Sequence, residues 1–420
     1  MQPYLKTALV APAAVDVHCR RTAAVAKLIA HHLFLPSEEK DLLCAACLMY
    51  QRKVGLLAPK GMERLSADFS GVDAPAVVME DPVPVVIRGV LNAYDVPGRG
   101  TALESRLASI LRLADAFDQN MEAQAIGGEE VGEILDRLRG GVEDGLWPEE
   151  SINALVQSTR PPPIIQVESW PVPVFPQAAL RTMRLMRDPR ASLANVVEAA
   201  SLDPATAGLV MRLSNSALFG SRTRVSTLSQ AIGRLGFATS QKVITAAALQ
   251  PVFDSSKLQE AWQHSLQVAD LSEQLACQAG AINPAEAYLA GLLHDVGRIA
   301  LLSMPLYDSA RLHGLMCGGC PPVYVENLLL RTDHAALGAQ IAAGWRLPDT
   351  MVSGIRLHHR PEKAESPLAY LLYVAEYLSG SDEDLPSVIR LEASLKAIGL
   401  AWDDIADCTV SALGRWLVAA

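Results

Sequence analysis

The chain has 420 residues and a formal net charge of −10 at pH 7, with 50% hydrophobic and only 5% aromatic residues. This length suits two or three domains with separate cores, and the negative charge disfavours non-specific binding to nucleic acid or to an anionic membrane. No uncharged apolar run approaches the roughly 18 residues of a membrane span, and no secretory signal is convincing. We therefore expect a cytoplasmic protein with neither nucleic acid nor a membrane among its partners.

Apolar residues at helical spacing begin near the amino terminus. The pattern runs from Asp16 to Leu48, with a break at residues 36–39 where Ser37 is suited to cap a second helix. Cys44 and Cys47 lie inside this pattern and have the spacing of a redox dithiol or of half a zinc site. Because a buried cysteine behaves as a small apolar residue, we expect both thiols to serve packing.

Helical patterning returns at residues 104–121 and again at residues 131–142. The segment STRPPPIIQVESWPVPVFPQ, residues 158–177, holds six prolines and no helical period, which is typical of an extended linker. The predicted organisation is therefore a helical domain at residues 1–157, a Pro-rich linker at 158–177, and a second helical domain with a C-terminal helical extension at 178–420.

Helix signals are dense after the linker. Asp203 precedes Pro204 as a capping acid before a proline in the first turn, and Thr227 and Gln230 have capping-box spacing. Few segments alternate polar and apolar residues, so little sheet is expected. The sequence predicts an all-α fold in two halves.

Two features of the second half leave alternatives open. Cys317 and Cys320 form a second CxxC pair in a Gly/Pro turn, where structural packing is favoured over a reactive dithiol. The segment after Gly380 has the pattern of amphipathic helices, which would dock on the core or mediate a homodimer. Docking is the expected outcome.

Six of the nine histidines lie in the second half, and five of these belong to an ordered set with two acids. His294 and Asp295 are adjacent within the apolar run GLLHDVGRIALL, although charged residues are rarely buried unless they are paired or bind an ion. The candidate metal ligands are His264, His294, Asp295, His334, His358, His359 and Glu376.

Imidazole nitrogens and carboxylate oxygens suit a divalent metal such as Fe, Mn, Zn or Mg, and helices of one bundle can direct them at a common centre. Such an ion would lower the pKa of a bound water for attack on phosphorus. The alternative is a metal-free cluster in which His264 or His358 completes a hydrogen-bond network with the His294-Asp295 pair. Both interpretations require these side chains to converge.

The order H…HD…H…HH…acid resembles that of the HD superfamily of helical metal-dependent phosphohydrolases. Residues 175–237, above all LSNSALFG and VSTLSQAIGRLG, are similar to the start of an HDOD domain, and the likeness extends from about Val172 to about Gly380. This resemblance implies an output domain of bacterial signalling proteins that regulates or recruits other proteins, in most members without catalysis. HD enzymes end the motif with Asp, where this chain has Glu376, so we assign no catalytic residue.

The first half resembles an HD-GYP domain, the family that hydrolyses cyclic di-GMP, over roughly residues 15–125. On this likeness His18 matches the first ligand and Asp115 the last, in SRLASILRLADAFDQNM. Met49-Tyr50 stands where the HD pair should follow, and Ala93-Tyr94 stands where the double histidine should be. Since two ligands do not make a tight metal site, we expect a degenerate domain without hydrolytic activity.

These observations favour a signal-transduction protein that acts as a non-catalytic protein-interaction module, with other signalling proteins as partners. Sensing of a nucleotide such as cyclic di-GMP stays open, because degenerate enzyme folds often keep a pocket. The alternative is a metal-dependent phosphohydrolase or phosphodiesterase that uses the site around His294 and Asp295. A helix-turn-helix interpretation of residues 227–244 is disfavoured by the acidic charge.

Overall fold

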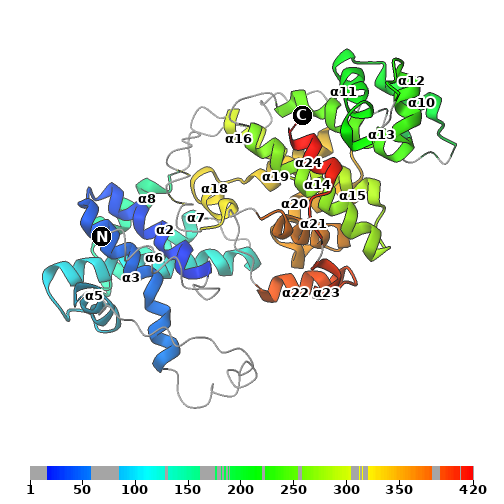
Figure 1. Ribbon diagram of the computed structural model, residues 1–420. Coiled ribbons are helices and arrows are strands. Elements are labelled where there is room, and N and C mark those ends of the chain that lie inside the picture. Colours follow the sequence, from blue (N-terminus) through cyan, green and yellow to red (C-terminus); the bar gives the residue numbers. More distant parts are fainter. Residues whose placement is uncertain are drawn as a thin grey trace. The chain divides into compact units, whose positions relative to one another are not determined.

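The computed structural model, shown in Figure 1, describes residues 17–57, 85–127, 131–160, 190–219, 223–253, 258–303, 320–380, 388–406 and 408–419, with a few single residues between these ranges. Every regular element in these ranges is a helix, which confirms the predicted all-α fold. None of the helices in the described residues is both long and apolar enough to cross a membrane.

The contacts of the chain group it into two compact units. The first consists of residues 1–162 and 310–329, and the second of residues 163–309 and 330–420. Most of the predicted Pro-rich linker, residues 161–175, lies outside the described residues, and the boundaries at 157 and 178 stay a prediction. The sequence did not suggest that residues 310–329 would group with the first half.

The first unit is built on helix α2, Val17–His32, which packs against three others. Its partners α3, α6 and α8 comprise Ser37–Leu57, Ala102–Gly127 and Glu149–Ser158. Helices α5, Val85–Asp95, and α7, Val131–Glu143, pack on α6, and α18, Pro322–Leu330, contributes all but its last residue to this unit. Buried Leu, Ile and Phe side chains of α6 fill the centre of the unit, because apolar residues recur there at helical spacing.

Four helices open the described part of the second unit: α10, Leu193–Ala200; α11, Pro204–Ser214; α12, Leu228–Leu235; and α13, Phe237–Leu249. The predicted caps are present. Asp203 accepts a hydrogen bond from the Thr206 backbone N–H at 2.8 Å, and Thr227 and Gln230 form a reciprocal capping box. These contacts satisfy backbone donors that the first helical turn leaves without partners.

The remaining helices of this unit carry the candidate ligands and the C-terminal extension. They are α14, Gln259–Ala279; α15, Pro284–Leu293; α16, Gly297–Ser303; α19, His334–Gly344; α20, Asp349–Leu357; α21, Pro367–Leu378; α22, Val388–Ala397; α23, Trp402–Ile405; and α24, Ala412–Ala419. Short 3-10 turns lie at Ala217–Phe219, Gln250–Phe253 and Pro361–Lys363.

Two glycines allow helices of the second unit to approach closely. A Cβ atom on Gly291 of α15 would lie 2.7 Å from the Ala269 Cα of α14. A Cβ atom on Gly297 would lie 1.9 Å from the His334 carbonyl oxygen, so α16 begins in direct backbone contact with α19. These crossings bring α14, α15, α16 and α19 together near the His294-Asp295 pair.

The last helix, α24, docks on α14, as expected for the C-terminal extension. The buried Asp270 carboxylate of α14 accepts hydrogen bonds from the Ser411 backbone N–H at 2.6 Å and from the Ser411 hydroxyl at 2.7 Å. Asp270 thereby supplies a carboxylate at the start of α24, where backbone donors and the helix dipole favour negative charge.

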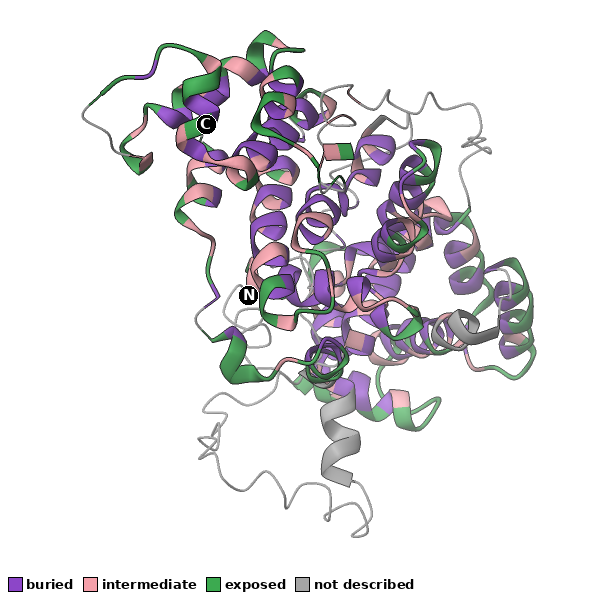
Figure 2. Cartoon of the chain, turned by 90° about the vertical axis from the view of Figure 1, so that its right-hand side faces the viewer, coloured by how far each residue is buried: buried purple, intermediate pink, exposed green. Residues whose placement is uncertain are grey.

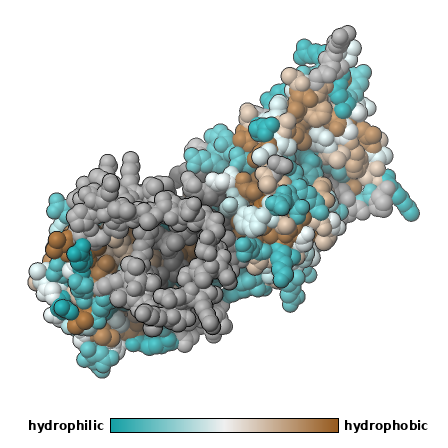
Figure 3. Space-filling model, turned by 60° about the horizontal axis from the view of Figure 1, so that its bottom comes forward, coloured by the Kyte–Doolittle hydropathy of each residue, from teal (hydrophilic) through white to brown (hydrophobic). Residues whose placement is uncertain are grey.

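Most helices bury one side and expose the other, as the purple and green segments of Figure 2 show. On the face shown in Figure 3, hydrophobic and hydrophilic residues are interspersed. Large apolar side chains that are exposed, such as Phe34 in the turn after α2 and Trp402 in α23, come from several segments of both units. Cys44 and Cys47 are buried, and burial raises the pKa of both thiols, which makes them poor nucleophiles. Cys317 lies outside the described residues.

Candidate metal centre

All seven predicted ligands lie in the second unit and come from helix ends or helix faces that meet. Helix α14 supplies His264 and α21 supplies Glu376, while α19 begins with His334. The remaining four follow the last residues of two helices: His294 and Asp295 come directly after α15, and His358 and His359 come directly after α20. Three overlapping triads have ligand atoms that all lie within 4.8 Å of one another; they are His334-His358-His359, His264-His294-Glu376 and His294-Asp295-His358.

Two of the imidazoles have their tautomers set by the backbone. His294 Nδ1 lies 2.7 Å from the Gly291 carbonyl oxygen, and His358 Nδ1 lies 2.6 Å from that of Ile355. A carbonyl oxygen only accepts, so each Nδ1 carries the proton and donates it. The neutral ring then presents a lone pair on Nε2, and both Nε2 atoms are buried without a hydrogen-bond partner. Metal-binding histidines are commonly oriented in this way.

Asp295 lies at the centre of these contacts. Its Oδ1 is 3.2 Å from His334 Nε2, and its Oδ2 is 3.7 Å from His294 Nε2 and 2.7 Å from Arg298 Nε. Burial opposes a charge on this carboxyl, but the neighbouring Arg298 guanidinium, the largest opposing influence, helps to hold the pKa of Asp295 well below its usual range. The buried group is therefore a carboxylate.

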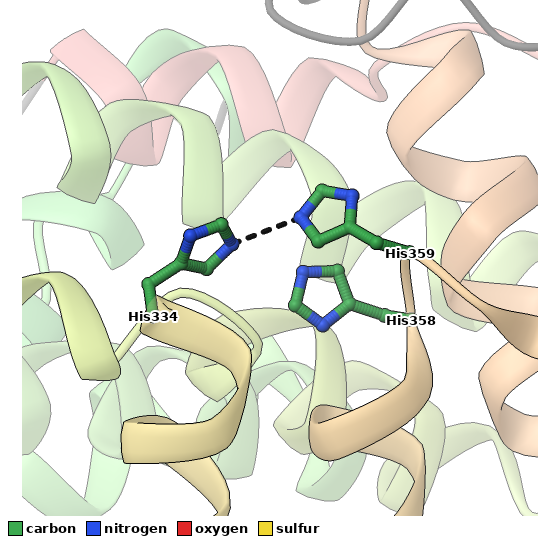
Figure 4. Close-up of side chains that lie close together, drawn as sticks. All are labelled: His334, His358 and His359. Atoms are coloured by element: carbon green, nitrogen blue, oxygen red, sulfur yellow. Dashed lines mark hydrogen bonds between the residues drawn. The ribbon is translucent and has the colours of Figure 1, made fainter. Parts of the chain in front are cut away.

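A second contact group surrounds His359. Its Nε2 lies 2.9 Å from His334 Nε2, the dashed line of Figure 4, and its ring centroid is 4.0 Å from that of His358. Of the two facing Nε2 atoms one must donate and the other accept. Glu376 Oε2 is 3.8 Å from His359 Nδ1, so the longer acid still reaches the cluster.

Burial sets the protonation of the cluster. Desolvation lowers the pKa of His294 to about 4, and it lowers those of His358 and His359 well below their usual range, with further lowering from neighbouring imidazoles. The rings are neutral at pH 7 and can offer lone pairs. Nitrogen and carboxylate donors in this number suit Fe, Mn or Zn better than Mg, which prefers oxygen alone.

The candidate centre is closed. Four of the ligand residues are 0% exposed, namely His294, Asp295, His334 and His358, and Glu376 is 6% exposed. His359 is 8% exposed, and of the seven only His264 is half-buried. A phosphodiester would need an opening to reach such a centre, because its phosphate has to contact the ion.

The first unit holds a different polar cluster around His18 and Asp115. His18 lies between two carboxylates, with Nε2 at 2.8 Å from Asp115 Oδ1 and Nδ1 at 2.6 Å from Asp118 Oδ2. Tyr50 and Tyr94 each donate a hydroxyl hydrogen bond of 2.6 Å to Asp115. Both nitrogens of His18 therefore donate, and these bonds raise the pKa of His18 to about 9.

From the sequence, Tyr50 and Tyr94 were expected only to occupy positions where an HD-GYP domain has metal ligands. In the structure both hydroxyls donate to the carboxylate of Asp115, the residue at the last of those ligand positions. Sequence reasoning missed Asp118, which also accepts from Arg21 Nε at 2.9 Å. Its position one helical turn after Asp115 was the available signal, since residues three apart lie on one helix face. It also missed Arg298, three residues after Asp295.

Part of the chain is similar to known proteins. The sequence model of the HDOD domain matches residues 172–361, which include all candidate ligands except Glu376. An uncharacterized protein of Treponema pallidum is 24% identical over 313 residues, which are 71% of this chain and 61% of that protein. Ribonuclease Y of Geobacter sulfurreducens is 32% identical over 129 residues, 31% of this chain and 20% of the enzyme.

Among solved structures, an HDOD domain protein of unknown function from Geobacter sulfurreducens aligns with 59% of this chain and 88% of its own, with 23% identity and a TM-score of 0.47. The chain spans less than two thirds of the length of the two curated relatives described above. The activities of those whole proteins therefore belong to those proteins and are not assigned to this chain. From its own match to the family model, the chain contains an HDOD domain at residues 172–361.

Proposed function

We propose that this protein is a bacterial signal-transduction protein in which the HDOD domain binds other signalling proteins and does not hydrolyse phosphoesters. The observation that carries this proposal is the closure of the second-unit centre. Six of its seven candidate ligands are at most 8% exposed, so the ligands are arranged to hold an ion and not to present it to a substrate.

A divalent metal fits the donor set as a resident structural group. His294, Asp295 and His358 would hold it, with His264, His334, His359 and Glu376 completing the surroundings. The bare, buried Nε2 atoms of His294 and His358 support this assignment, because a buried polar atom without a partner is costly unless something binds it. The ion would cross-link the C-terminal ends of α15 and α20 and so rigidify the surface that partners recognise.

The first unit supports the same proposal from another direction. We infer that it is a degenerate HD-GYP-like domain, in which Tyr50, Tyr94 and His18 satisfy the Asp115 carboxylate directly. A carboxylate that already accepts these hydrogen bonds has little capacity left for an ion. Cyclic di-GMP is the nucleotide to test as a ligand of this unit, bound and not cleaved.

The second candidate function is a metal-dependent phosphodiesterase that uses the His294-Asp295 centre. It is favoured by the presence of both residues of the HD pair and by the identity with part of Ribonuclease Y. It would require the closed centre to open for a substrate. Glu376 in place of Asp argues against it, because the added methylene shifts the carboxylate relative to a catalytic ion.

Metal analysis and turnover assays on the purified full chain separate the two candidates. We expect at least one equivalent of Fe, Mn or Zn per chain and no cleavage of bis(4-nitrophenyl) phosphate, cyclic di-GMP or a short single-stranded RNA with added Mn²⁺ or Fe²⁺. Cleavage that Asp295→Ala abolishes would overturn the non-catalytic proposal. A metal content far below one equivalent per chain would contradict the proposal of a resident ion.

Binding partners are then identified by cross-linking in the native cell, with the wild-type chain compared with His294→Gln. If the ion shapes the surface that partners recognise, the variant loses cross-links that the wild type makes. Identical cross-links in both chains would contradict a role of the ion in partner binding.

A further inference from the structure

Arg298 lies beside the candidate ligands and has no part in the function proposed above. It is the second residue of α16 and follows Asp295 by three positions. Its Nε lies 2.7 Å from Asp295 Oδ2, and its side chain is 19% exposed whereas that of Asp295 is 1% exposed. A cation that can reach water therefore contacts a carboxylate that cannot.

The same carboxylate is the oxygen donor of the triad His294-Asp295-His358, whose ligand atoms lie within 4.8 Å of one another. If this triad held an ion, the Asp295 carboxylate would contact two positive charges, the ion and the Arg298 guanidinium. Charges repel strongly at such distances when water is excluded. A metal and Arg298 would therefore compete for Asp295.

The backbone around Arg298 restricts how this competition can be resolved. Gly297 is in direct contact with the start of α19, where an added Cβ atom would meet the His334 carbonyl oxygen at 1.9 Å. The Arg298 backbone N–H donates to the Asp295 carbonyl oxygen at 2.9 Å. The main chain is therefore held in place, so giving up Asp295 to an ion would require a movement of the Arg298 side chain alone.

We propose that Arg298 is an internal counter-ion that pairs with Asp295 in the metal-free protein and yields it when an ion binds. This inference rests on the proposed metal centre. It makes Arg298 a positioning residue: without metal it holds the Asp295 carboxylate in place, and it lowers the affinity for the ion because the ion must displace the guanidinium.

Titration calorimetry of the metal-free full chain with Mn²⁺ and Zn²⁺ tests the role of Arg298. Arg298→Met should bind at least one of these ions about tenfold more tightly than the wild type, because the competing cation is gone. Arg298→Lys, which keeps the charge, should stay within about threefold of the wild-type affinity. Arg356→Met is the matched control, since it removes an exposed arginine of the same unit, and its affinity should equal that of the wild type.

A purely structural role of Arg298 predicts the opposite direction, because damage to the site weakens binding. Unchanged or weaker binding by Arg298→Met overturns the proposal. Failure of both the wild type and the variant to bind either ion overturns it together with the metal centre. Phosphodiester turnover, in contrast, would overturn the proposal of a non-catalytic function and would not affect the conclusion that Arg298 is a counter-ion. The melting temperature of metal-free Arg298→Met should be lower than that of the wild type and recover when metal is added.

Discussion

The imidazoles of His294 and His358 meet edge to face, with 5.2 Å between their ring centroids and 88° between their planes. Each donates its Nδ1 proton to the carbonyl oxygen three residues earlier in the chain. The Nε2 lone pairs of the two rings cannot bond to each other, and each is buried without a partner. This relationship favours an ion over the alternative of a closed hydrogen-bond network.

Metal removal is therefore expected to destabilise the protein through His294. An ion present at 100 times its dissociation constant contributes about 2.7 kcal/mol to the free energy of unfolding. A chelator should lower the melting temperature of the wild type and leave that of His294→Gln unchanged, which differential scanning calorimetry measures. His31→Gln, a change of the same kind at an exposed histidine, should keep the full chelator effect. An equal chelator effect in His294→Gln would contradict the assignment.

The first-unit cluster is expected to be independent of metal. Tyr94→Phe removes a hydrogen bond to the Asp115 carboxylate and should lower the free energy of unfolding by about 1–3 kcal/mol, as measured in urea, because the acceptor is charged. The metal content of the chain should not change. Tyr377→Phe, at a tyrosine that is 41% exposed, serves as the control and should be close to neutral. A Tyr94→Phe protein that gains an equivalent of metal would show that Tyr94 had displaced an ion.

The fold class and the identities of the candidate ligands could be predicted because both depend on local pattern. Apolar spacing predicted helices around His18 and Asp115, and the order of histidines and acids predicted which side chains of the second half would converge. The seven side chains do lie together, while their role as metal ligands stays a prediction. The capping residues Asp203 and Thr227 act locally and were recognised for the same reason.

The parts that could not be predicted depend on packing between distant segments. The spacing places Asp118 on the same helix face as Asp115, but its contact with His18 follows from the packing of α2 against α6. The grouping of residues 310–329 with the first unit is likewise a long-range result. Tyr324 illustrates it: the residue lies in α18, and the Arg21 guanidinium of α2 lies 5.5 Å from the centre of its ring.

Stability should depend on pH through His18. Side-chain hydrogen bonds to Asp115 and Asp118 raise the pKa of His18 to about 9, from about 6.5 in the unfolded chain. A raised pKa stabilises the fold fully below pH 6.5, and this contribution is lost as the pH rises through 9. The free energy of unfolding should therefore fall by about 3 kcal/mol over this range.

The measurement is urea denaturation at a series of pH values between 6 and 10. His18→Gln should remove most of the slope between pH 6.5 and 9, whereas His32→Gln, at an exposed position in the same helix, should preserve it. A slope that survives in His18→Gln would assign the pH dependence to other groups.

The close contact between α16 and α19 gives a last prediction, at Gly297. Alanine there would place a Cβ atom 1.9 Å from the His334 carbonyl oxygen and 2.5 Å from the Gly338 backbone nitrogen, and neither backbone atom can move without moving α19. Gly297→Ala should therefore lower the free energy of unfolding by about 2 kcal/mol or more through overpacking. It should also weaken Mn²⁺ or Zn²⁺ binding, because Asp295 and His334 are displaced from each other.

Gly233→Ala, at a helical glycine of α12 with open space around it, should instead be neutral or stabilising, since alanine favours the helix. If both variants behave alike in denaturation and in metal titration, backbone contact at Gly297 does not position the centre.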